Sequence, residues 1–497
     1  MRQYYYQNLM RLMLIGISLL LPLRLLAATP RATVQKPLVV AHFMHQMSIG
    51  AEHGAGEGMF AAAPSTVNGV MAHHIDEYLV NYRHPYDAAR QDIAYAKNCG
   101  IDAFTLLLSA SHLPASQFAN TIKAYYQVAC ERGDFYLAPD IWEGNLTEAN
   151  VTKLANALRL LKDNYDAAWL RFHGKRVVLM FPSMPFAEFD TKVLSVLGGI
   201  DNVYLITYGY PKDPAWAQHA SGFTNWHAHV GYGEESSLRD LEWQTAQVTG
   251  VDYWQPVSPA FQQSRSWPKT FMPNVREKLG MTAFTQAWEQ AIAHQAPGVF
   301  LQTWNDLTED MAVMPETNHG FAYYDLTTFY AQWFHTGKQP PITKDTLLVF
   351  HHPQLVNGMQ LPPGRKPMPT FAWISTPPTD YVGVVSFLTQ PATVTVSLGE
   401  KVLAQRECPA GFSKWLIYNP GTLAPNEFGK RTPVYPIANA ALAITTLDKP
   451  LWDAELYLAV TRQQRRLGVF RSHRPIVEAA GRGDLCTIGD VFNIPPQ

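Results

Sequence analysis

The stretch YDAARQDIAYAKNCGIDAFTLLL, residues 86–108, decides the fold class of this 497-residue chain. In its first part, residues 86–99, small and apolar side chains recur at helical spacing, and Gly100 then ends the helix. Its second part, residues 101–108, is an apolar run of the length of a buried strand. A helix followed at once by a buried strand is typical of α/β proteins with a parallel sheet.

The same alternation extends in both directions, from Lys36 to about Gly337. The strand candidates are residues 37–43, 101–108, 135–138, 177–181, 203–207, 222–226, 253–257 and 298–303. Helical patterns separate most of them. Eight such units over about 300 residues predict a closed (β/α)8 barrel. A doubly wound open sheet is the alternative, but no G-x-G-x-x-G turn follows any of these strands.

The pattern changes at the glycine- and proline-rich segment 337–341. Beyond it, short β-rich segments are separated by turn residues. Examples are residues 381–387, 392–398 and 456–460. This pattern predicts a small antiparallel β-sandwich that packs on the barrel. We therefore expect the barrel over residues 29–340 and a β-rich accessory domain over residues 341–497.

The N-terminus predicts export. Arginines flank an uncharged run, residues 12–23, which as a helix would span only about 18 Å. The hydrocarbon core of a membrane is about 30 Å thick, so a membrane anchor is the weaker interpretation and no stable membrane insertion is expected. A signal peptide over residues 1–28, ending in two alanines, fits better. We expect a periplasmic or extracellular protein.

The composition excludes one class of function and favours another. Lys and Arg number 39 against 41 Asp and Glu, so the chain lacks the basic excess of a nucleic-acid binder. Charged residues make up only 16% of the chain, while aromatic residues reach 12%. Sparse charge with many aromatic rings suits an exported protein that binds neutral sugars.

The four cysteines are not spaced as metal ligands, since none forms a C-x-x-C pair or a Cys/His cluster. Their even number permits disulfides in an oxidising compartment. Pairing within each domain would join Cys99 to Cys130 and Cys408 to Cys486. Four buried free thiols are the alternative.

The best candidate for a catalytic site follows the last strand. Residues 304–310 read WNDLTED, with Asp306 and Glu309 three positions apart at the carboxyl end of a barrel strand. Glycosidic cleavage requires two carboxyl groups, one to protonate the leaving oxygen and one to activate water or attack the sugar. Trp304 and Asn305 would contact the sugar. The alternative is a solvated helix start, where acidic residues are favoured by the helix dipole.

Other polar and aromatic residues lie within or near the ends of predicted strands. Candidates for sugar binding are His42, Asp140, Trp142, Trp226, His227, Tyr232 and Trp254. Each has a structural alternative: a helix N-cap for the aspartate, a packed histidine, or a tryptophan in the core. The Gly-, Ala- and His-rich segment 45–81 follows the first strand and predicts a long loop on the catalytic face.

Residues 303–309, Thr-Trp-Asn-Asp-Leu-Thr-Glu, resemble the Thr-Trp-Asn-Asp-x-x-Glu signature of glycoside hydrolase family 71, the α-1,3-glucanases or mutanases. Further segments are similar to this family in the same order: residues 39–44, 92–104, 256–259, 324–326, 333–337 and 391–394. The resemblance implies a secreted barrel enzyme that hydrolyses α-1,3 links of an α-glucan with inversion.

The residues themselves leave the mechanism open. Side chains three apart on a helical turn have Cβ atoms about 5–6 Å apart, which is compatible with a retaining or an inverting pair. We assign Glu309 as general acid, from its longer reach and from desolvation by Trp304, and Asp306 as general base. The alternatives are another barrel glycosidase, such as an endo-α-mannosidase-like enzyme, and a non-catalytic glycan-binding protein. We expect a monomer that acts on a polysaccharide and needs neither metal nor organic cofactor.

Overall fold

The computed structural model describes residues 36–44, 85–110, 116–143, 146–182, 192–193, 195–210, 219–232, 234–263, 266–267, 270–271, 274–306, 309–316, 318–356, 379–418, 442–447, 451–477 and 487–495. The chain divides into two compact units, residues 1–36 and 37–497, and the fold described below is that of the second. The predicted signal peptide, residues 1–28, and the predicted long loop, residues 45–81, lie outside the described residues.

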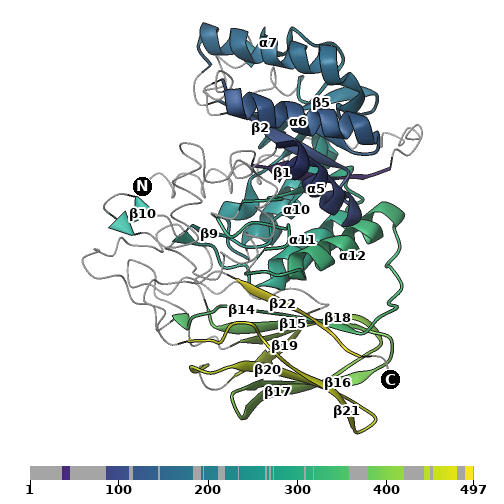
Figure 1. Ribbon diagram of the computed structural model, residues 1–497, viewed down its shortest axis with the longest axis vertical. Helices are drawn as coiled ribbons and strands as arrows, with labels where there is room; N and C mark the ends of the chain where they lie inside the picture. Colours follow the sequence, from purple (N-terminus) through teal and green to yellow (C-terminus); the bar gives the residue numbers. More distant parts are fainter. Residues whose placement is uncertain are drawn as a thin grey trace, which may run out of the picture. The chain divides into compact units, whose positions relative to one another are not determined.

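Eight parallel strands form a closed barrel, as predicted (Figure 1). They are β1 (Leu38–Phe43), β2 (Ala103–Leu108), β3 (Tyr136–Glu143), β5 (Lys175–Pro182), β6 (Val203–Tyr208), β7 (Gly222–Thr224), β8 (Asp252–Val257) and β13 (Gly298–Leu301). β1 pairs with both β2 and β13, and pairing of β3 with β5 closes the ring. The sequence did not predict the short β4 (Arg171–Phe172), which pairs antiparallel with β5.

Helices surround this ring. They are α5 (Pro85–Asn98), α6 (Ser116–Arg132), α7 (Glu148–Tyr165), α10 (Glu234–Thr249), α11 (Met281–Ala293) and α12 (Ala322–Thr336). α5 buries Ala89, Ile93 and Ala96 along one face, at the spacing seen in the sequence. Gly100 follows with φ of +90°, and a Cβ there would lie 2.8 Å from that of Ala331. None of the described helices is long and apolar enough to cross a membrane.

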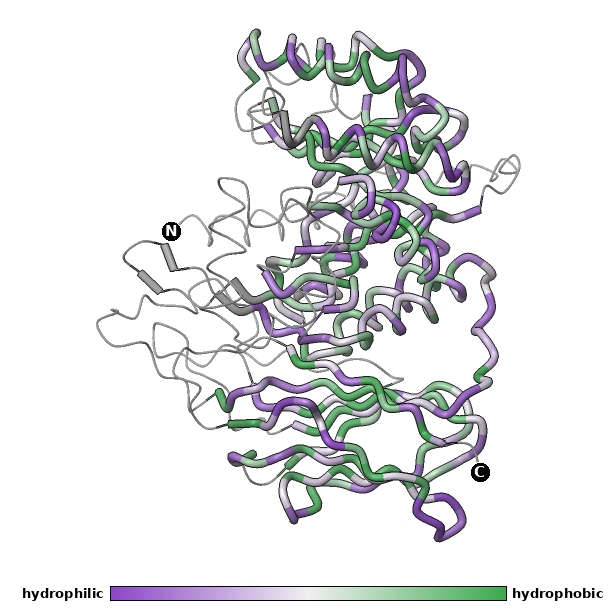
Figure 2. Tube along the Cα trace, viewed as in Figure 1, coloured by the Kyte–Doolittle hydropathy of each residue, from purple (hydrophilic) through white to green (hydrophobic). Residues whose placement is uncertain are grey.

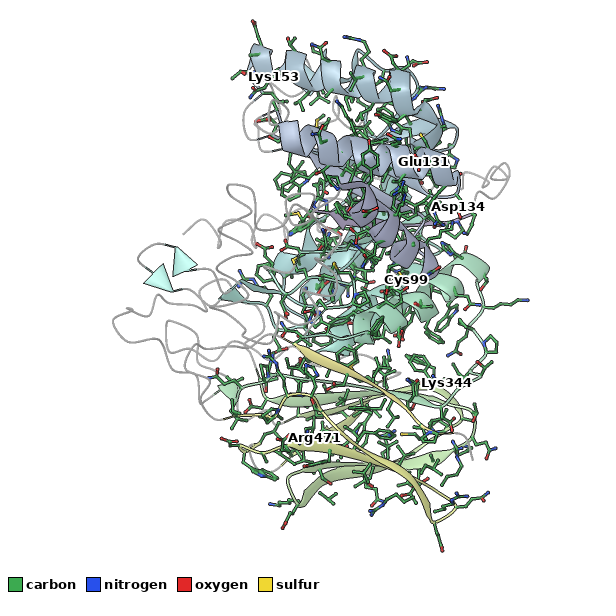
Figure 3. All side chains as sticks on the ribbon, viewed as in Figure 1. Cys99, Glu131, Asp134, Lys153, Lys344 and Arg471 are labelled. Carbon is green, nitrogen blue, oxygen red and sulfur yellow. The ribbon has the colours of Figure 1, made fainter. Side chains whose placement is uncertain are left out.

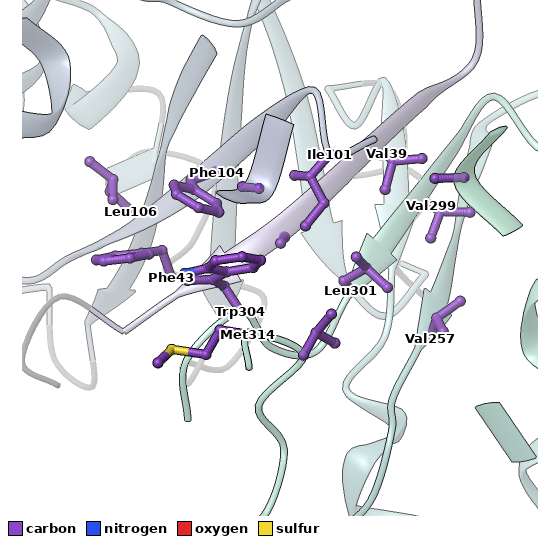
Figure 4. Close-up of a cluster of buried hydrophobic side chains, with 14 of the residues drawn as sticks. Val39, Phe43, Ile101, Phe104, Leu106, Val257, Val299, Leu301, Trp304 and Met314 are labelled. Carbon is purple, nitrogen blue, oxygen red and sulfur yellow. The ribbon is translucent and has the colours of Figure 1, made fainter. Parts of the chain in front are cut away.

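Strand alternation divides the apolar residues into two cores. One cluster takes Val40, Leu179, Trp254 and Phe300 from strands all around the ring, so it fills the barrel interior. The opposite faces of the strands, which include Val39, Val299 and Leu301, pack outside the ring (Figure 4). Hydrophobic and hydrophilic segments alternate along the trace, and the turn that joins residues 462 and 465 is hydrophilic (Figure 2).

The C-terminal part consists of two sheets that share a core. The five-stranded sheet has the order β19 (Leu442–Thr446), β18 (Gly411–Tyr418), β15 (Tyr381–Leu388), β14 (Thr346–His351) and β22 (Ile488–Asn493). The four-stranded sheet has the order β17 (Lys401–Cys408), β16 (Ala392–Leu398), β20 (Leu456–Arg462) and β21 (Arg465–Arg471). Residues of both, such as Val384 and Leu458, form one cluster, as in a sandwich. The pairing is antiparallel as predicted, except that β18 and β19 are parallel.

The sandwich packs on the barrel through close, partly charged contacts. Lys414 of β18 is buried and lies 2.6 Å from the carboxylate of Glu289 on α11, which also accepts the hydroxyl of Tyr330. Gly280, with φ of +56°, has no room for a side chain, since a Cβ would lie 2.7 Å from that of Phe350. The predicted domain limits, residues 29–340 and 341–497, stay predictions.

The predicted pairing of Cys99 with Cys130 is wrong. Both are free thiols, and Cys99 is buried among the apolar residues after α5, where its thiol donates to the carbonyl of Ala96 (Figure 3). Burial raises the pKa of the Cys99 thiol well above its usual value, so it stays protonated. Cys408 is also a free, buried thiol, which contradicts a bond to Cys486; Cys486 itself lies outside the described residues.

Candidate active site

The predicted carboxylate pair lies where the chain leaves β13. Asp306 is almost fully buried, and its backbone N–H donates to the Thr303 hydroxyl over 2.7 Å. Its Oδ1 accepts the backbone N–H of the half-buried Glu309 over 3.2 Å. The Asp306 carboxylate therefore fixes the turn on which both acidic residues stand. The described residues of this turn form no helix and Asp306 is buried, so they do not fit the alternative of a solvated helix start.

The turn is closed at its base by backbone hydrogen bonds. Thr303 donates to the carbonyl of Met311 over 2.9 Å, and Met311 donates to that of Asp306 over 3.0 Å. Val313 donates to the carbonyl of Thr303 over 3.1 Å, and Met314 to that of Trp304 over 3.0 Å. The two acidic residues thus stand on a closed loop at the carboxyl end of a barrel strand, where the active sites of such barrels lie.

Trp304 does not take its predicted place beside the carboxylates. Its side chain is fully buried outside the barrel ring, against Phe104, and its indole N–H donates to Asp92 of α5 over 3.1 Å (Figure 4). A ring held there cannot stack on a sugar. Its hydrogen bond to α5 also removes the argument that Trp304 desolvates the carboxyl group of Glu309.

Asn305 has a structural partner. Its side-chain oxygen accepts the backbone N–H of Met44 over 2.8 Å, and its amide donates to the carbonyl of Met44 over 3.2 Å. The backbone N–H of Trp304 donates to the carbonyl of His42 over 2.8 Å. Asn305, which directly precedes Asp306, therefore holds the loop that carries Asp306 against the segment that follows β1.

Two predicted residues, His42 and Asp140, meet inside the mouth of the barrel. The Nδ1 of His42, on β1, lies 2.9 Å from the Oδ2 of Asp140, on β3, and neither side chain is exposed. The same oxygen accepts the hydroxyl of Tyr208 over 2.6 Å and that of Thr105 over 3.3 Å. The Oδ1 accepts the indole N–H of Trp142 over 2.9 Å. Asp140 is thus the centre of a polar network and not a helix N-cap.

Half-buried aromatic rings surround this network at the carboxyl ends of the strands. The ring of Trp142 stacks on that of Phe181 with centroids 4.5 Å apart and planes 15° apart. Trp226, which follows β7, meets Trp142 and His42 edge-on at 5.4 and 5.3 Å. Rings of this kind are suited to stacking on a pyranose, and the sugar contacts of Trp142 and Trp226 stay predictions.

His227 and Tyr232 are buried, as His42 and Asp140 are, so these four predicted side chains present almost no surface to a sugar. The Nε2 of His227 lies 3.1 Å from Glu242 of α10, and the same carboxylate accepts the hydroxyl of Tyr253 over 2.6 Å. Burial opposes ionisation of Glu242, but His227 and the hydrogen-bond donors outweigh it and lower the pKa of this carboxyl group. Tyr232 is 2% exposed and belongs to the core outside the barrel ring.

Trp254 belongs to the core, the alternative to its predicted role. It is 1% exposed, and its ring packs over Gly298, the first residue of β13. Its indole N–H lies 3.4 Å from the hydroxyl of Tyr204, which donates to Asp252 at the start of β8. Its ring therefore fills the barrel at the level where β13 begins, away from the carboxyl ends.

The structure adds residues that the sequence did not single out. Tyr208, the last residue of β6, donates to Asp140; burial and this carboxylate raise its pKa well above the usual value and keep it protonated. Glu143, the last residue of β3, accepts the hydroxyl of Ser109 and the backbone N–H of Ala110 over 3.2 and 2.8 Å. Both end observed barrel strands, which extend beyond the predicted limits at residues 138 and 207. The strand-end rule that identified Asp140 could have found them once these limits were known.

Within the described ranges, no group of three or more His, Cys, Asp or Glu side chains is arranged to hold a metal ion. The chemistry that the site offers is that of carboxyl groups, one histidine and neutral hydrogen-bond donors.

Several solved structures are similar to this chain. A family 99 endo-α-mannosidase from Bacteroides thetaiotaomicron is 12% identical, with a TM-score of 0.43, covering 61% of this chain and 99% of its own. A β-glucuronidase from Bacteroides uniformis is 10% identical, with a TM-score of 0.37, covering 79% of this chain and 44% of its own. A family 5 subfamily 18 protein from Streptomyces cattleya is 12% identical, with a TM-score of 0.38, covering 63% and 84%. No curated protein matches the sequence.

A sequence model of one family matches most of the chain. Residues 66–422 match the model of glycosyl hydrolase family 71, and this range includes the loop with Asp306 and Glu309. It begins after β1, so the similarity noted for residues 39–44 lies outside it. A match of this length, with the carboxylate loop at the carboxyl end of a barrel strand, shows that the chain belongs to glycoside hydrolase family 71.

Proposed function

We propose that this glycosidase is an exported enzyme that hydrolyses α-1,3-glucosidic bonds of an α-glucan with inversion. The observation that carries the proposal is the segment 303–309, which resembles the α-1,3-glucanase signature and whose described residues, 303–306 and 309, follow β13. Family membership supports the reaction class. The linkage, the stereochemistry and the export rest on the sequence resemblance and on the N-terminal pattern.

In the proposed reaction, Glu309 gives a proton to the glycosidic oxygen as the bond to the anomeric carbon breaks. Asp306 takes a proton from the water that attacks that carbon from the opposite face. Asp306 is buried and held by the Glu309 N–H, while Glu309 is half-buried with the longer side chain. The greater reach and exposure of Glu309 favour it as the acid that meets the leaving group.

The substrate is best tested on linkage-defined polysaccharides: α-1,3-glucan, α-1,4-glucan, dextran and α-mannan. We expect reducing sugar to be released from α-1,3-glucan. Release from α-mannan alone would refute the linkage and favour an endo-α-mannosidase-like enzyme. Binding of α-1,3-glucan without any release would favour a glycan-binding protein.

The carboxylate pair is tested by Asp306→Asn and Glu309→Gln. Each should lower kcat by at least about 100-fold, the scale of general acid–base catalysis. Glu148→Gln, on the exposed first turn of α7, is a matched control and should leave kcat unchanged. NMR of the first product should show the β-anomer; an initial α-anomer would contradict inversion. Wild-type kcat in either active-site variant would refute the assignment of that residue.

A further inference from the structure

A group of buried charges lies directly behind the carboxylate loop. Asp310 follows Glu309 in the chain, and its side chain is buried together with those of His319 and Glu316. The Nε2 of His319 lies 3.2 Å from the Oδ1 of Asp310, and its Nδ1 lies 3.0 Å from the Oε1 of Glu316. These residues come from the segment between β13 and α12, so they belong to the barrel and not to the sandwich.

The surroundings of His319 favour its positively charged form. Its Nδ1 faces the carbonyl of Ala312, 3.3 Å away, and the carboxylate of Glu316, while its Nε2 faces the carboxylate of Asp310. A neutral imidazole has one nitrogen without a proton, and here that nitrogen would face only acceptors. Burial alone would lower the pKa of His319, but the charges of Glu316 and Asp310 outweigh it and raise the pKa to about 10.

Asp310 fixes the direction in which the chain leaves Glu309. It has φ of +58°, and its carboxylate is turned into the protein, where a buried charge is stable only if it is paired. Its Oδ1 is paired with His319, and its Oδ2 accepts the backbone N–H of Thr487 over 2.8 Å. Rotation of Asp310 would break both contacts, so the position of Glu309 depends on them.

The same group connects the loop to the sandwich. Thr487 immediately precedes β22, and Gly489 of β22 donates to the carbonyl of Asn318 over 2.8 Å. A Cβ at Gly489 would lie 2.9 Å from the carbonyl oxygen of His319, so the two chains are in direct contact. Strand β22 therefore supports the segment that holds His319.

We propose that His319 is a positioning residue of this glycosidase: its imidazolium, paired with Asp310 and Glu316, holds the loop with Asp306 and Glu309 in its productive geometry against β22. The proposal rests on the proposed function for the identity of the two catalytic carboxyl groups. It gives the C-terminal sandwich a role in catalysis through the contacts of Thr487 and Gly489.

The test compares His319→Gln with His352→Gln in the full-length protein. The control histidine is also buried, and it lies 3.1 Å from another buried carboxylate, that of Glu277, which precedes α11. On soluble α-1,3-glucan oligosaccharides, His319→Gln should lower kcat by about 100-fold, the scale expected for a misplacement of about 1 Å, with KM within about threefold. The control variant should keep the wild-type kcat.

A wild-type kcat in folded His319→Gln, or an equal loss in both variants, would overturn the proposal. Asp310→Asn is the second variant, because asparagine tolerates a positive φ and removes only the charge; it should lower kcat in the same way. Nitrogen-15 NMR of histidine-labelled wild type should show a ring protonated on both nitrogens at pH 8. A neutral ring would contradict only the proposed role of His319. Inactivity on every glucan would instead contradict the proposed function.

Discussion

Replacing Asp140 by asparagine tests the polar network in the mouth of the barrel. The carboxylate accepts four donors: Trp142 on Oδ1, and His42, Tyr208 and Thr105 on Oδ2. An asparagine of the same shape has one oxygen and one NH2 group. On one side of the network, donors that now bind a carboxylate oxygen would therefore face the NH2 group, which is itself a donor. A buried donor left without an acceptor costs about 1–3 kcal/mol, and hydrogen bonds to a charged acceptor are the stronger ones. We expect a loss of about 2–4 kcal/mol in the free energy of unfolding.

The assay is urea unfolding followed by tryptophan fluorescence, together with kcat on the substrate that the polysaccharide screen identifies. Because Asp140 orients both His42 and Trp142, activity should fall along with stability. Asp134→Asn is the matched control: this exposed aspartate pairs only at the surface with Arg132, and its loss should change stability by less than about 0.5 kcal/mol. An Asp140→Asn variant as stable as wild type would refute the reasoning, because a carboxylate with four donors cannot be replaced without loss.

Three further predictions follow from the described residues. The pKa of His319 is raised to about 10, so its stabilising effect is complete below about pH 6.5 and lost as the pH rises through 10; the groups that face it are Asp310, Glu316 and Tyr323. Between pH 7 and 9 the free energy of unfolding of the wild type should fall by about 2–3 kcal/mol relative to that of the double variant Asp310→Asn/His319→Gln. If urea titrations show the free energies of the two proteins changing in parallel with pH, this prediction is wrong. Gly298→Ala would place a Cβ in steric conflict with the ring of Trp254, so thermal unfolding should show a loss of about 1–3 kcal/mol in the free energy of unfolding, which Trp254→Phe should partly restore. A Gly298→Ala variant as stable as wild type would count against this packing. Alkylation in denaturant without reductant should label Cys99, Cys130 and Cys408, and protection of any of them would show a disulfide.

The barrel could be predicted from the sequence because its strands are buried on both faces. Runs such as residues 101–108 and 203–207 contain almost no charge, and helical patterns fill the intervals between them, which is typical of parallel strands. β4 was missed because two residues leave no periodicity to detect. The parallel pairing of β18 with β19 was missed for another reason: strand alternation gives the buried face of a strand but not its direction or its neighbour.

The candidate site was predictable only in part. Asp140, Trp142 and Asp306 were found because they lie at strand ends, and Tyr208 and Glu143 have the same signal. The sequence could not show that Asp140 binds His42, because the two residues are 98 positions apart and meet only when β1 and β3 assemble on either side of β2. The predicted disulfides were wrong for a similar reason, since an even number of cysteines permits pairing but does not bring two thiols together.

Trp304 shows where strand reasoning stops. Along β13, Gly298 and Phe300 face the barrel interior while Val299 and Leu301 face outward, and continued alternation would direct residues 302 and 304 inward. Gln302 still follows this alternation, since its side chain hydrogen-bonds to the backbone of Asn225 and Ala228 beyond β7. β13 ends at residue 301, however, and the backbone of Trp304 bonds instead to residues 42, 313 and 314. That turn directs the indole of Trp304 outward to Asp92 and leaves the next residues, Asn305 and Asp306, at the mouth of the barrel. The ring that was predicted to be part of the site therefore anchors the loop that carries Asp306.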